Sequence, residues 1–244
     1  MQLIQGNCLE KMKEIPNKSI DMICVDLPYE QTKNAWDCMI PFEPLWEQYS
    51  RIIKDNGAIV LFGNGMFTAK LMMSNPNMWR YNLVWDKVIA GGFLNANRMP
   101  LRRHEDICVF YKKLPVYNPQ KTIGKPNHSR GTPMKVGSKI NNNYGDYGWV
   151  DNREELGNLK HPTSIITISK DHPSIMKHPT QKPVELLEWL VKTYTNEGDL
   201  VLDSCMGSGT CGIACRNTNR NFIGIEVNEE YFTLAVSRIK GEQK

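Results

Sequence analysis

Two short hydrophobic runs at opposite ends of the chain each stop at an acidic residue that begins a turn. Residues 20–25 run into the sequence DLPY at 26–29, and residues 200–202 run into Asp203 and the GSGT loop at 207–210. Apolar residues on both faces are typical of strands in a parallel sheet that helices cover on both sides. Because ligands of such sheets bind outside the carboxyl ends of the strands, we expect the two turns to form one site.

Segments typical of strands and of helices alternate along most of the chain. We expect seven strands, centred near residues 3, 23, 60, 83, 108, 201 and 224. The expected helices cover residues 41–53, 66–74, 184–194, 208–216 and 228–239. Strands that alternate with helices predict an α/β fold with a doubly wound, Rossmann-like parallel sheet.

The alternation breaks between residues 113 and 177, where the chain is polar and only residues 164–168 resemble a strand. A segment of this length is too long for an ordinary loop, so we predict an inserted, substrate-facing region between two parts of one main domain, 1–112 and 178–244. The insertion contains ten Lys and Arg against five Asp and Glu, within a chain whose net charge is +4. A basic excess confined to one region favours a phosphate-facing surface, with a solvated loop as the alternative.

Composition argues against several classes of protein. No stretch approaches the about 18 uninterrupted apolar residues of a membrane span, and the N-terminal residues lack the basic and apolar regions of a secretion signal. We therefore expect a soluble, cytoplasmic protein. The seven cysteines include no C-x-x-C pair, and no histidine accompanies them at the spacing of a zinc site. We accordingly expect reduced structural thiols and no bound metal.

The GSGT loop lies where a cofactor would approach the backbone. Glycine permits close approach of a ligand, and free N–H groups at the start of the following helix favour a carboxylate or a phosphate. Glu226 ends the next strand about twenty residues later, where a carboxylate can accept hydrogen bonds from both hydroxyls of a ribose. A mononucleoside cofactor such as S-adenosylmethionine fits this arrangement at least as well as a dinucleotide, although the loop alone would also suit a packing turn.

The DLPY sequence suits a flat substrate that carries an amine. The exocyclic amine of a nucleobase is a poor nucleophile because its lone pair is delocalised into the ring. The Asp26 carboxylate and the Leu27 carbonyl could accept both N–H bonds and so direct that lone pair toward a methyl donor. Pro28 would stiffen the turn, and the Tyr29 ring offers a face on which a base extruded from the duplex can stack. The alternative is a helix-capping Asp before a proline turn.

Two further motifs carry polar side chains near the expected ends of helices or strands. The sequence HPTQKP at 178–183 precedes a helix, and its polar side chains at 180–182 could meet an amino-acid carboxylate. An ordinary helix-entry turn is the alternative. His104 and Glu105 could form a catalytic pair, although a polar cap to the following strand is the favoured interpretation.

Together, these motifs resemble the β-group of DNA amino-methyltransferases. In that family a D-P-P-Y-type catalytic motif comes first, a target-recognition region follows, and an H-x-T-x-K-P segment and a glycine-rich cofactor motif come last. DLPY, the insertion, HPTQKP and GSGT follow the same order here, and the resemblance covers essentially the whole chain outside 113–177. It implies a circularly permuted, seven-stranded methyltransferase sheet, in which the strand near residue 3 is the one that follows Glu226 and its helix in the unpermuted family.

The resemblance also implies a role for each motif. S-adenosylmethionine would be held by residues of the glycine-rich and flanking segments, namely Asn7, Cys8, Thr180, Gln181, Lys182, Asp203, Gly207, Gly209, Thr210 and Glu226. The catalytic residues would be Asp26, Leu27, Pro28 and Tyr29. Double-stranded DNA would be contacted by basic residues of the insertion, namely Lys121, Lys125, Arg130, Lys135 and Lys139. Two positions depart from the family, in which Pro often stands at 27 and Asp usually stands at 7.

The expected activity is methyl transfer to the N6 amine of an adenine flipped out of DNA, because an acidic first residue in the catalytic motif goes mainly with adenine in this family. Cytosine-N4 methylation is the alternative, since the residues alone allow either amine. A catalytically silent DNA-binding protein of the same fold, or transfer to RNA or a protein amide, also stays open. The resemblance further suggests a homodimer, a cognate restriction endonuclease as a partner, and a bacterial or phage origin.

Overall fold

The computed structural model describes residues 1–29, 39–125, 134–136, 148–150, 158–171 and 181–241. The chain divides into two compact units. The first comprises Met1–Asn118 and Ser164–Lys244, and the second comprises Pro119–Thr163. The second unit is shorter than the 113–177 insertion expected from the sequence, because both ends of that segment belong to the first unit.

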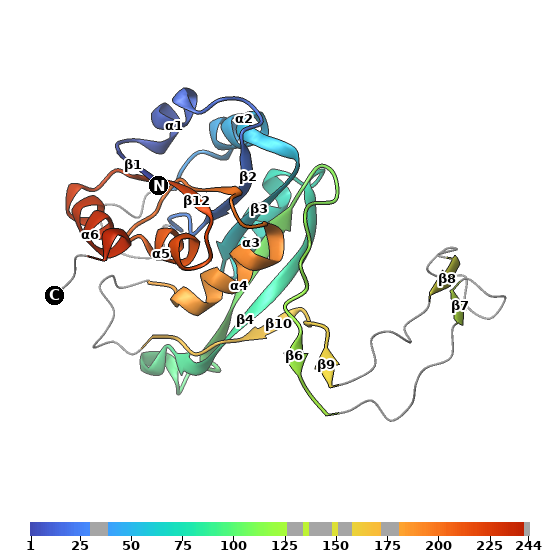
Figure 1. The fold of residues 1–244 in the computed structure, drawn as a ribbon. Helices are drawn as coiled ribbons and strands as arrows, with labels where there is room; N and C mark the ends of the chain where they lie inside the picture. Colours follow the sequence, from blue (N-terminus) through green and yellow to red (C-terminus); the bar gives the residue numbers. More distant parts are fainter. Residues whose placement is uncertain (30–38, 126–133, 137–147, 151–157, 172–180, 242–244) are drawn as a thin grey trace. The chain divides into compact units, whose positions relative to one another are not determined.

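In the described part of the chain, the first unit is built around a sheet of eight strands (Figure 1). In chain order they are β1 (Gln2–Gln5), β2 (Ile20–Val25), β3 (Ile53–Gly63), β4 (Trp79–Gly91), β5 (Arg102–Phe110), β10 (Ile165–Thr167), β11 (Leu200–Asp203) and β12 (Asn221–Glu226). Across the sheet the order is β1-β12-β11-β2-β3-β5-β4-β10. Neighbouring strands run parallel, except that β5 runs antiparallel to both β3 and β4.

The sheet differs from the expected one at two points. All seven expected strands form, but residues 165–167 add β10, so the prediction of a seven-stranded sheet was wrong. β10 pairs with the outer edge of β4, where the Val84 N–H donates to the Ser164 carbonyl oxygen at 2.8 Å. The sheet is also mixed rather than purely parallel, because a short connection joins β4 directly to β5 and so reverses the direction of the chain.

Strand pairing joins segments from near opposite ends of the sequence. β1 pairs in parallel with β12, and this places Leu3 opposite Gly224 and Gln5 opposite Glu226. The first strand of the chain therefore lies beside its last strand. That is the arrangement that a permuted sheet requires.

Helices cover both faces of the sheet. On one face lie α1 (Cys8–Lys11), α2 (Phe42–Ile52) and α3 (Met66–Ser74), and on the other lie α4 (Val184–Tyr194), α5 (Thr210–Asn217) and α6 (Glu229–Lys240). The central strand β2 shows why both faces need cover. Met22 and Cys24 belong to the core beneath α4–α6, whereas Ile23 and Val25 belong to the core beneath α1–α3. A strand buried on both sides must be mostly apolar, and in β2 only Asp21, which is partly exposed near the start of the strand, departs from this.

Within the second unit, two short antiparallel pairs of strands are described. They are β6 (Thr122–Ile123) with β9 (Leu159–Lys160), and β7 (Met134–Val136) with β8 (Gly148–Val150). Three of the residues expected to contact DNA fall among the described ones: Lys121 and Lys125 are exposed, and Lys135 lies in β7. Arg130 and Lys139 lie outside the described residues.

Membrane spans and metal clusters are both absent from the described ranges. These ranges contain no helix that is both long and apolar enough to cross a membrane. Within them, no three His, Cys, Asp or Glu side chains gather as a metal ion would require. Six cysteines are described, each of them a free thiol, and five of the six are buried.

Candidate active site

A cavity of about 610 Å³ opens at the carboxyl edge of the sheet. Because β2, β11 and β12 are parallel neighbours, the residues at their ends, Asp26, Asp203 and Glu226, lie at this one edge. The cavity wall includes twelve of the fourteen residues that the sequence assigned to catalysis or to the cofactor, namely Asn7, Cys8, Asp26, Leu27, Pro28, Tyr29, Gln181, Lys182, Asp203, Gly207, Thr210 and Glu226. The structure therefore brings the two turns of the sequence into one cavity.

The GSGT loop contains two glycines with a left-handed backbone, and their surroundings differ. Gly207, at φ +50°, lines the cavity, and a Cβ atom there would meet no other atom within 4 Å. Gly209, at φ +79°, faces α6, where a Cβ atom would lie 2.9 Å from the Ala235 Cβ. Gly209 does not line the cavity, and its missing side chain permits close packing against α6; its contact with the cofactor stays a prediction. The remaining residue, Thr180, lies outside the described residues.

Glu226 is held at the end of β12 by backbone donors. Its Oε2 accepts a hydrogen bond from the Gly207 N–H at 2.8 Å, and its Oε1 accepts one from the Asn228 N–H at 2.8 Å. The Gly6 N–H donates to the Glu226 carbonyl oxygen at 2.9 Å, which holds the segment before α1 against the same strand end. Since each carboxylate oxygen offers two lone-pair directions, Glu226 retains acceptor capacity for a ligand.

Asn7 and Gln181 connect separate segments of the cavity wall. Asn7 caps α1, because its Oδ1 accepts a hydrogen bond from the Leu9 N–H at 2.9 Å. The Gln181 Nε2 donates to Asp171 Oδ2 at 3.0 Å, and the Ser208 hydroxyl donates to Gln181 Oε1 at 3.4 Å. Gln181 therefore links the segment before α4 to the GSGT loop.

Asp203 is buried at the end of β11, with 6% of its surface exposed. Burial raises the pKa of Asp203 to about 8, and the nearby Asp26 and Glu226 carboxylates contribute in the same direction. The Cys205 N–H donates to Asp203 Oδ1 at 3.1 Å and offsets only part of this effect. Much of Asp203 is consequently protonated at neutral pH in the free protein.

Asp26 has a partner on each carboxylate oxygen. The Tyr29 hydroxyl donates to Oδ1 at 2.6 Å, and the Lys182 Nζ lies 2.6 Å from Oδ2. The same Nζ lies 3.3 Å from Glu105 Oε2, and the Lys87 Nζ lies 3.1 Å from Glu105 Oε1. Four side chains therefore alternate in charge from the end of β2 to the β4–β5 pair, and the first three, Asp26, Lys182 and Glu105, line the cavity.

The alternating charges offset the free-energy cost of burying these charged side chains. Burial disfavours the charged form of Lys182, but Asp26 and Glu105 outweigh it and raise the pKa of the Lys182 ammonium. Burial likewise disfavours the charged form of Glu105, but Lys182 and Lys87 outweigh it and lower the pKa of the Glu105 carboxyl. The sequence assigned Lys182 to the cofactor, whereas in the structure its ammonium is paired with the catalytic motif.

Tyr29 contributes both its hydroxyl and its ring to the site. The ring packs against Phe67, with the ring centroids 4.5 Å apart and the planes 31° from each other. Burial and the Asp26 carboxylate hold the pKa of the Tyr29 hydroxyl well above its usual range, so the hydroxyl stays a proton donor. Tyr29 therefore orients Asp26 and also presents an aromatic surface to the cavity.

Asn64 and Trp85 also line the cavity but were not predicted from the sequence, and Glu105 was not expected in this wall. Asn64 follows the buried strand β3 as Asp26 follows β2, so the same strand-end rule could have found it. Trp85 and Glu105 face each other across β4 and β5, a pairing that only the strand order reveals. His104, which the sequence analysis considered as a catalytic partner of Glu105, is exposed.

A family model described as DNA methylase, covering the N6 and N4 enzymes, matches residues 20–237. The chain belongs to this family. It is therefore a DNA amino-methyltransferase by descent, and the resemblance carried by its motifs is confirmed. The type II methyltransferase M.HpaI of Haemophilus parainfluenzae is 28% identical to it over 254 residues, which cover 99% of this chain and 74% of M.HpaI.

Two solved structures extend the similarity of this methylase chain to three dimensions. The crystal structure of the M1.HpyAVI–SAM complex matches with a TM-score of 0.65 and 26% identity, covering 98% of each chain. The PvuII DNA methyltransferase, which is cytosine-N4-specific, matches with a TM-score of 0.69 and 16% identity, covering 97% of this chain and 85% of that one. The second likeness shows the fold alone. Both confirm that the mostly parallel α/β sheet is that of DNA methyltransferases.

Proposed function

We propose that this methylase transfers a methyl group from S-adenosylmethionine to the N6 amine of an adenine that has left the base stack of double-stranded DNA. The observation that carries the proposal is the position of Asp26, which shares one cavity wall with Asp203, Gly207 and Glu226. A cofactor bound by those three residues would occupy the same cavity as a substrate amine bound by Asp26.

The cavity suits S-adenosylmethionine in size and in chemistry. Its volume of about 610 Å³ falls within the roughly 300–1,000 Å³ of small-molecule sites. Glu226 offers oriented acceptors for ribose hydroxyls, and Gly207 leaves the backbone open. Asp203 offers a carboxyl group whose ionised form a positively charged ligand would favour. When bound, the cofactor supplies a methyl group on a positively charged sulfur. The solved M1.HpyAVI relative, whose structure is a complex with SAM, supports this assignment.

Asp26 would hold and polarise the target amine. In the free protein its Oδ2 contacts the Lys182 Nζ, so an arriving N–H must share or replace that contact. Glu105 Oε2, 3.3 Å from the same Nζ, gives Lys182 a second partner when this happens. The Leu27 carbonyl would accept the other N–H. Because carboxylates are feeble bases for aromatic amines, Asp26 orients the nitrogen, and the proton leaves to solvent after transfer.

Adenine is supported over cytosine by the identity of residue 26. In this family an acidic first residue of the catalytic motif goes mainly with adenine, and a serine there goes with the cytosine amine. Cytosine-N4 remains the second candidate, because the PvuII enzyme has the same fold and either amine presents two N–H bonds. Identifying the methylated nucleoside in the product therefore decides between adenine and cytosine.

Target recognition is assigned to the inserted segment 113–177, and catalysis and cofactor binding to 1–112 and 178–244. The exposure of Lys121 and Lys125 supports a role in binding phosphates. M.HpaI is named as a type II methyltransferase, which supports a cognate restriction endonuclease as a partner of this methylase too. A homodimer follows from family resemblance only.

Nucleoside mass spectrometry tests the proposal directly. Purified protein is incubated with unmethylated DNA and isotopically labelled cofactor, and the hydrolysed DNA is searched for labelled N6-methyladenine and N4-methylcytosine. Label in N6-methyladenine is expected, and Asp26→Ala protein serves as the control that should yield none. Label in N4-methylcytosine would overturn the choice of base. Folded protein that labels neither base would overturn the proposed activity.

A further inference from the structure

The β4–β5 hairpin extends beyond the cavity wall at the edge of the sheet that holds the active site. Trp85 and Glu105, both in the cavity wall, pair across this hairpin, and Gly91 pairs with Arg102 farther out. Gly91 lies six positions after Trp85, which is at most roughly 20 Å at the rise of a strand. The tip of the hairpin, residues 92–101, therefore lies within reach of a DNA duplex whose base occupies the cavity.

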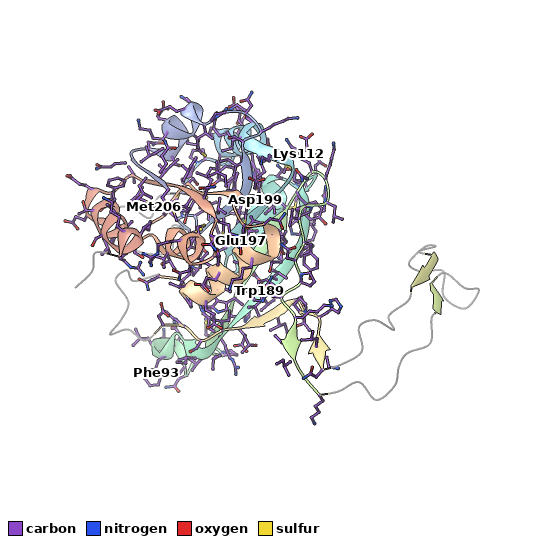
Figure 2. The ribbon with its side chains drawn as sticks, in the orientation of Figure 1. Phe93, Lys112, Trp189, Glu197, Asp199 and Met206 are labelled. Atoms are coloured by element: carbon purple, nitrogen blue, oxygen red, sulfur yellow. The ribbon has the colours of Figure 1, made fainter. Side chains whose placement is uncertain are left out.

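The tip exposes large apolar side chains. Phe93 is 82% exposed and Leu94 is 97% exposed, and Met99 and Leu101 are exposed as well. Figure 2 shows Phe93 at the outer end of the hairpin, beyond the end of β4. A turn needs only small or polar residues such as glycine and asparagine. Apolar side chains gathered at its tip therefore indicate a surface that is covered by a partner.

The same tip is positively charged. Residues 88–104 contain three arginines and no acidic residue. Arg103 forms a two-bond pair with Asp86, at 2.7 and 2.9 Å, whereas Arg98 and Arg102 are exposed and form no ion pair with any residue that the structure describes. An apolar tip flanked by such cations complements a polyanion whose interior consists of stacked, apolar base faces.

We propose that this tip is a DNA wedge. Phe93 and Leu94 enter the base stack beside the target base, and Arg98 and Arg102 bind the flanking phosphates. The inference rests on the proposed function, since it requires a duplex from which one base is extruded into the cavity. Extrusion leaves a gap in the stack, and apolar side chains such as Phe and Leu are those that proteins insert between base steps.

A second copy of the chain fits the tip less well than DNA does. A two-fold interface places the same patch on both subunits. Arg98 and Arg102 of one copy would then approach the like charges of the other, with no acid in residues 88–104 to compensate them. DNA supplies the missing negative charge.

The test compares two duplexes that contain the enzyme's own methylation site. One is fully paired, and the other lacks the base opposite the target, which lowers the cost of extruding the target. Full-length Phe93→Ala/Leu94→Ala protein should methylate the paired duplex about tenfold or more slowly than wild type in a single turnover, since alanine cannot stack on a base. Its rate should largely recover on the second duplex. Met73→Ala, which removes another exposed side chain, from α3, is the matched control and should behave as wild type.

DNA affinity gives a readout that does not depend on catalysis. Arg98→Gln/Arg102→Gln should bind DNA more weakly and lower the slope of log affinity against log salt by about two, because two arginines no longer neutralise phosphates. An unchanged slope, or equal loss of rate on both duplexes in the Phe93→Ala/Leu94→Ala protein, would overturn the wedge. A change of oligomeric mass in that variant would assign the tip to a second copy instead. Wild-type protein that binds DNA but methylates neither duplex would overturn the proposed function separately.

Discussion

The Asp26 carboxylate shares its two oxygens between Tyr29 and Lys182, so these two neighbours control how it meets a substrate amine. Tyr29 donates from the same turn, and Lys182 reaches Asp26 from the segment before α4, which lies 156 positions away in the sequence. At the scale of single residues, the site is therefore an acceptor that is already oriented and charge-compensated before the amine arrives.

Asp26→Ala should abolish methyl transfer while largely preserving DNA and cofactor binding. Orientation of reacting groups can contribute roughly 7–11 kcal/mol, so we expect the rate to fall by at least about a thousandfold. Asp26→Asn should lose less, because the amide oxygen still accepts an N–H, although its interaction with Lys182 weakens. Single-turnover rates of the three proteins measure this. An Ala variant near the wild-type rate would contradict the assigned role of Asp26.

Tyr29→Phe should be more damaging than the sequence alone indicates. As a stacking surface only, the residue would tolerate phenylalanine, but the structure adds the 2.6 Å hydrogen bond to Asp26. Hydrogen bonds to charged groups contribute about 1.5–3 kcal/mol, so kcat should fall roughly ten- to a hundredfold. Tyr29→Ala should lose more because the ring is gone as well. Cofactor affinity, measured by calorimetry, should not change, and a Phe variant with wild-type kcat would show that stacking suffices.

The raised pKa of Asp203 predicts a pH-dependent stability. The group titrates near pH 8 in the folded protein and near its ordinary value of 3.8 in the unfolded chain. Between these values only the folded state binds the proton, so its contribution to stability falls as pH rises and is lost above about pH 8. Asp203→Asn cannot ionise, so its stability lacks this fall with rising pH. Its Tm relative to wild type, without cofactor, should rise from about pH 5 to about pH 8.5, and a constant difference would contradict the shift.

At the scale of elements, the turn from β11 to α5 depends on glycine for two separate reasons. Gly207 faces the cavity, so a methyl group there would enter the space available to a ligand. Gly209 faces α6, so a methyl group there would collide with Ala235. One short loop thus shapes the cavity and allows the last helix to pack closely.

The variants Gly207→Ala and Gly209→Ala should therefore fail in different ways. Both place alanine in a left-handed conformation, which costs roughly 1–2 kcal/mol. Gly209→Ala should cost about 1–3 kcal/mol more because it also overpacks the interface with α6. Gly207→Ala should instead show the larger loss of S-adenosylmethionine affinity. Urea unfolding measures the loss of stability, and calorimetry measures the loss of S-adenosylmethionine affinity. Equal losses of both quantities in the two variants would contradict these separate roles.

At the scale of the whole molecule, the chain forms one unit that contains the candidate active site and a second unit, Pro119–Thr163, in which two short antiparallel strand pairs are described. The described residues that line the candidate active site all belong to the first unit. If DNA is bound by the basic second unit, DNA affinity and cofactor affinity should be separable by mutation.

Neutralising the five basic residues of the insertion together should weaken binding to every DNA sequence. They are Lys121, Lys125, Arg130, Lys135 and Lys139. Each phosphate that is no longer neutralised should reduce the slope of log affinity against log salt by about 0.9. Calorimetry with S-adenosylmethionine alone should give the wild-type affinity. An unchanged salt slope would move the DNA-binding surface elsewhere on the protein, and the hairpin tip would then be the first candidate.

The strands, the two strand-end turns and the family could be predicted from the chain alone. Hydrophobic runs, prolines and glycines act over a few residues, so the ends of β2 and β11 are visible in DLPY and GSGT without any knowledge of neighbours. Parallel topology then brings those ends to one edge, which is why Asp26, Asp203 and Glu226 could be grouped in advance.

The partners of these residues, in contrast, depend on the three-dimensional fold. The ion pair of Lys182 with Asp26, the place of Glu105 in the cavity wall and the packing role of Gly209 each join segments that are distant in the sequence. β10 likewise joined the sheet because β4 offered an open edge. Such pairings follow from the order of the strands in the sheet. That order is set by how the two cores pack on opposite faces of the sheet. Because this packing involves the whole chain, no local sequence pattern predicts it.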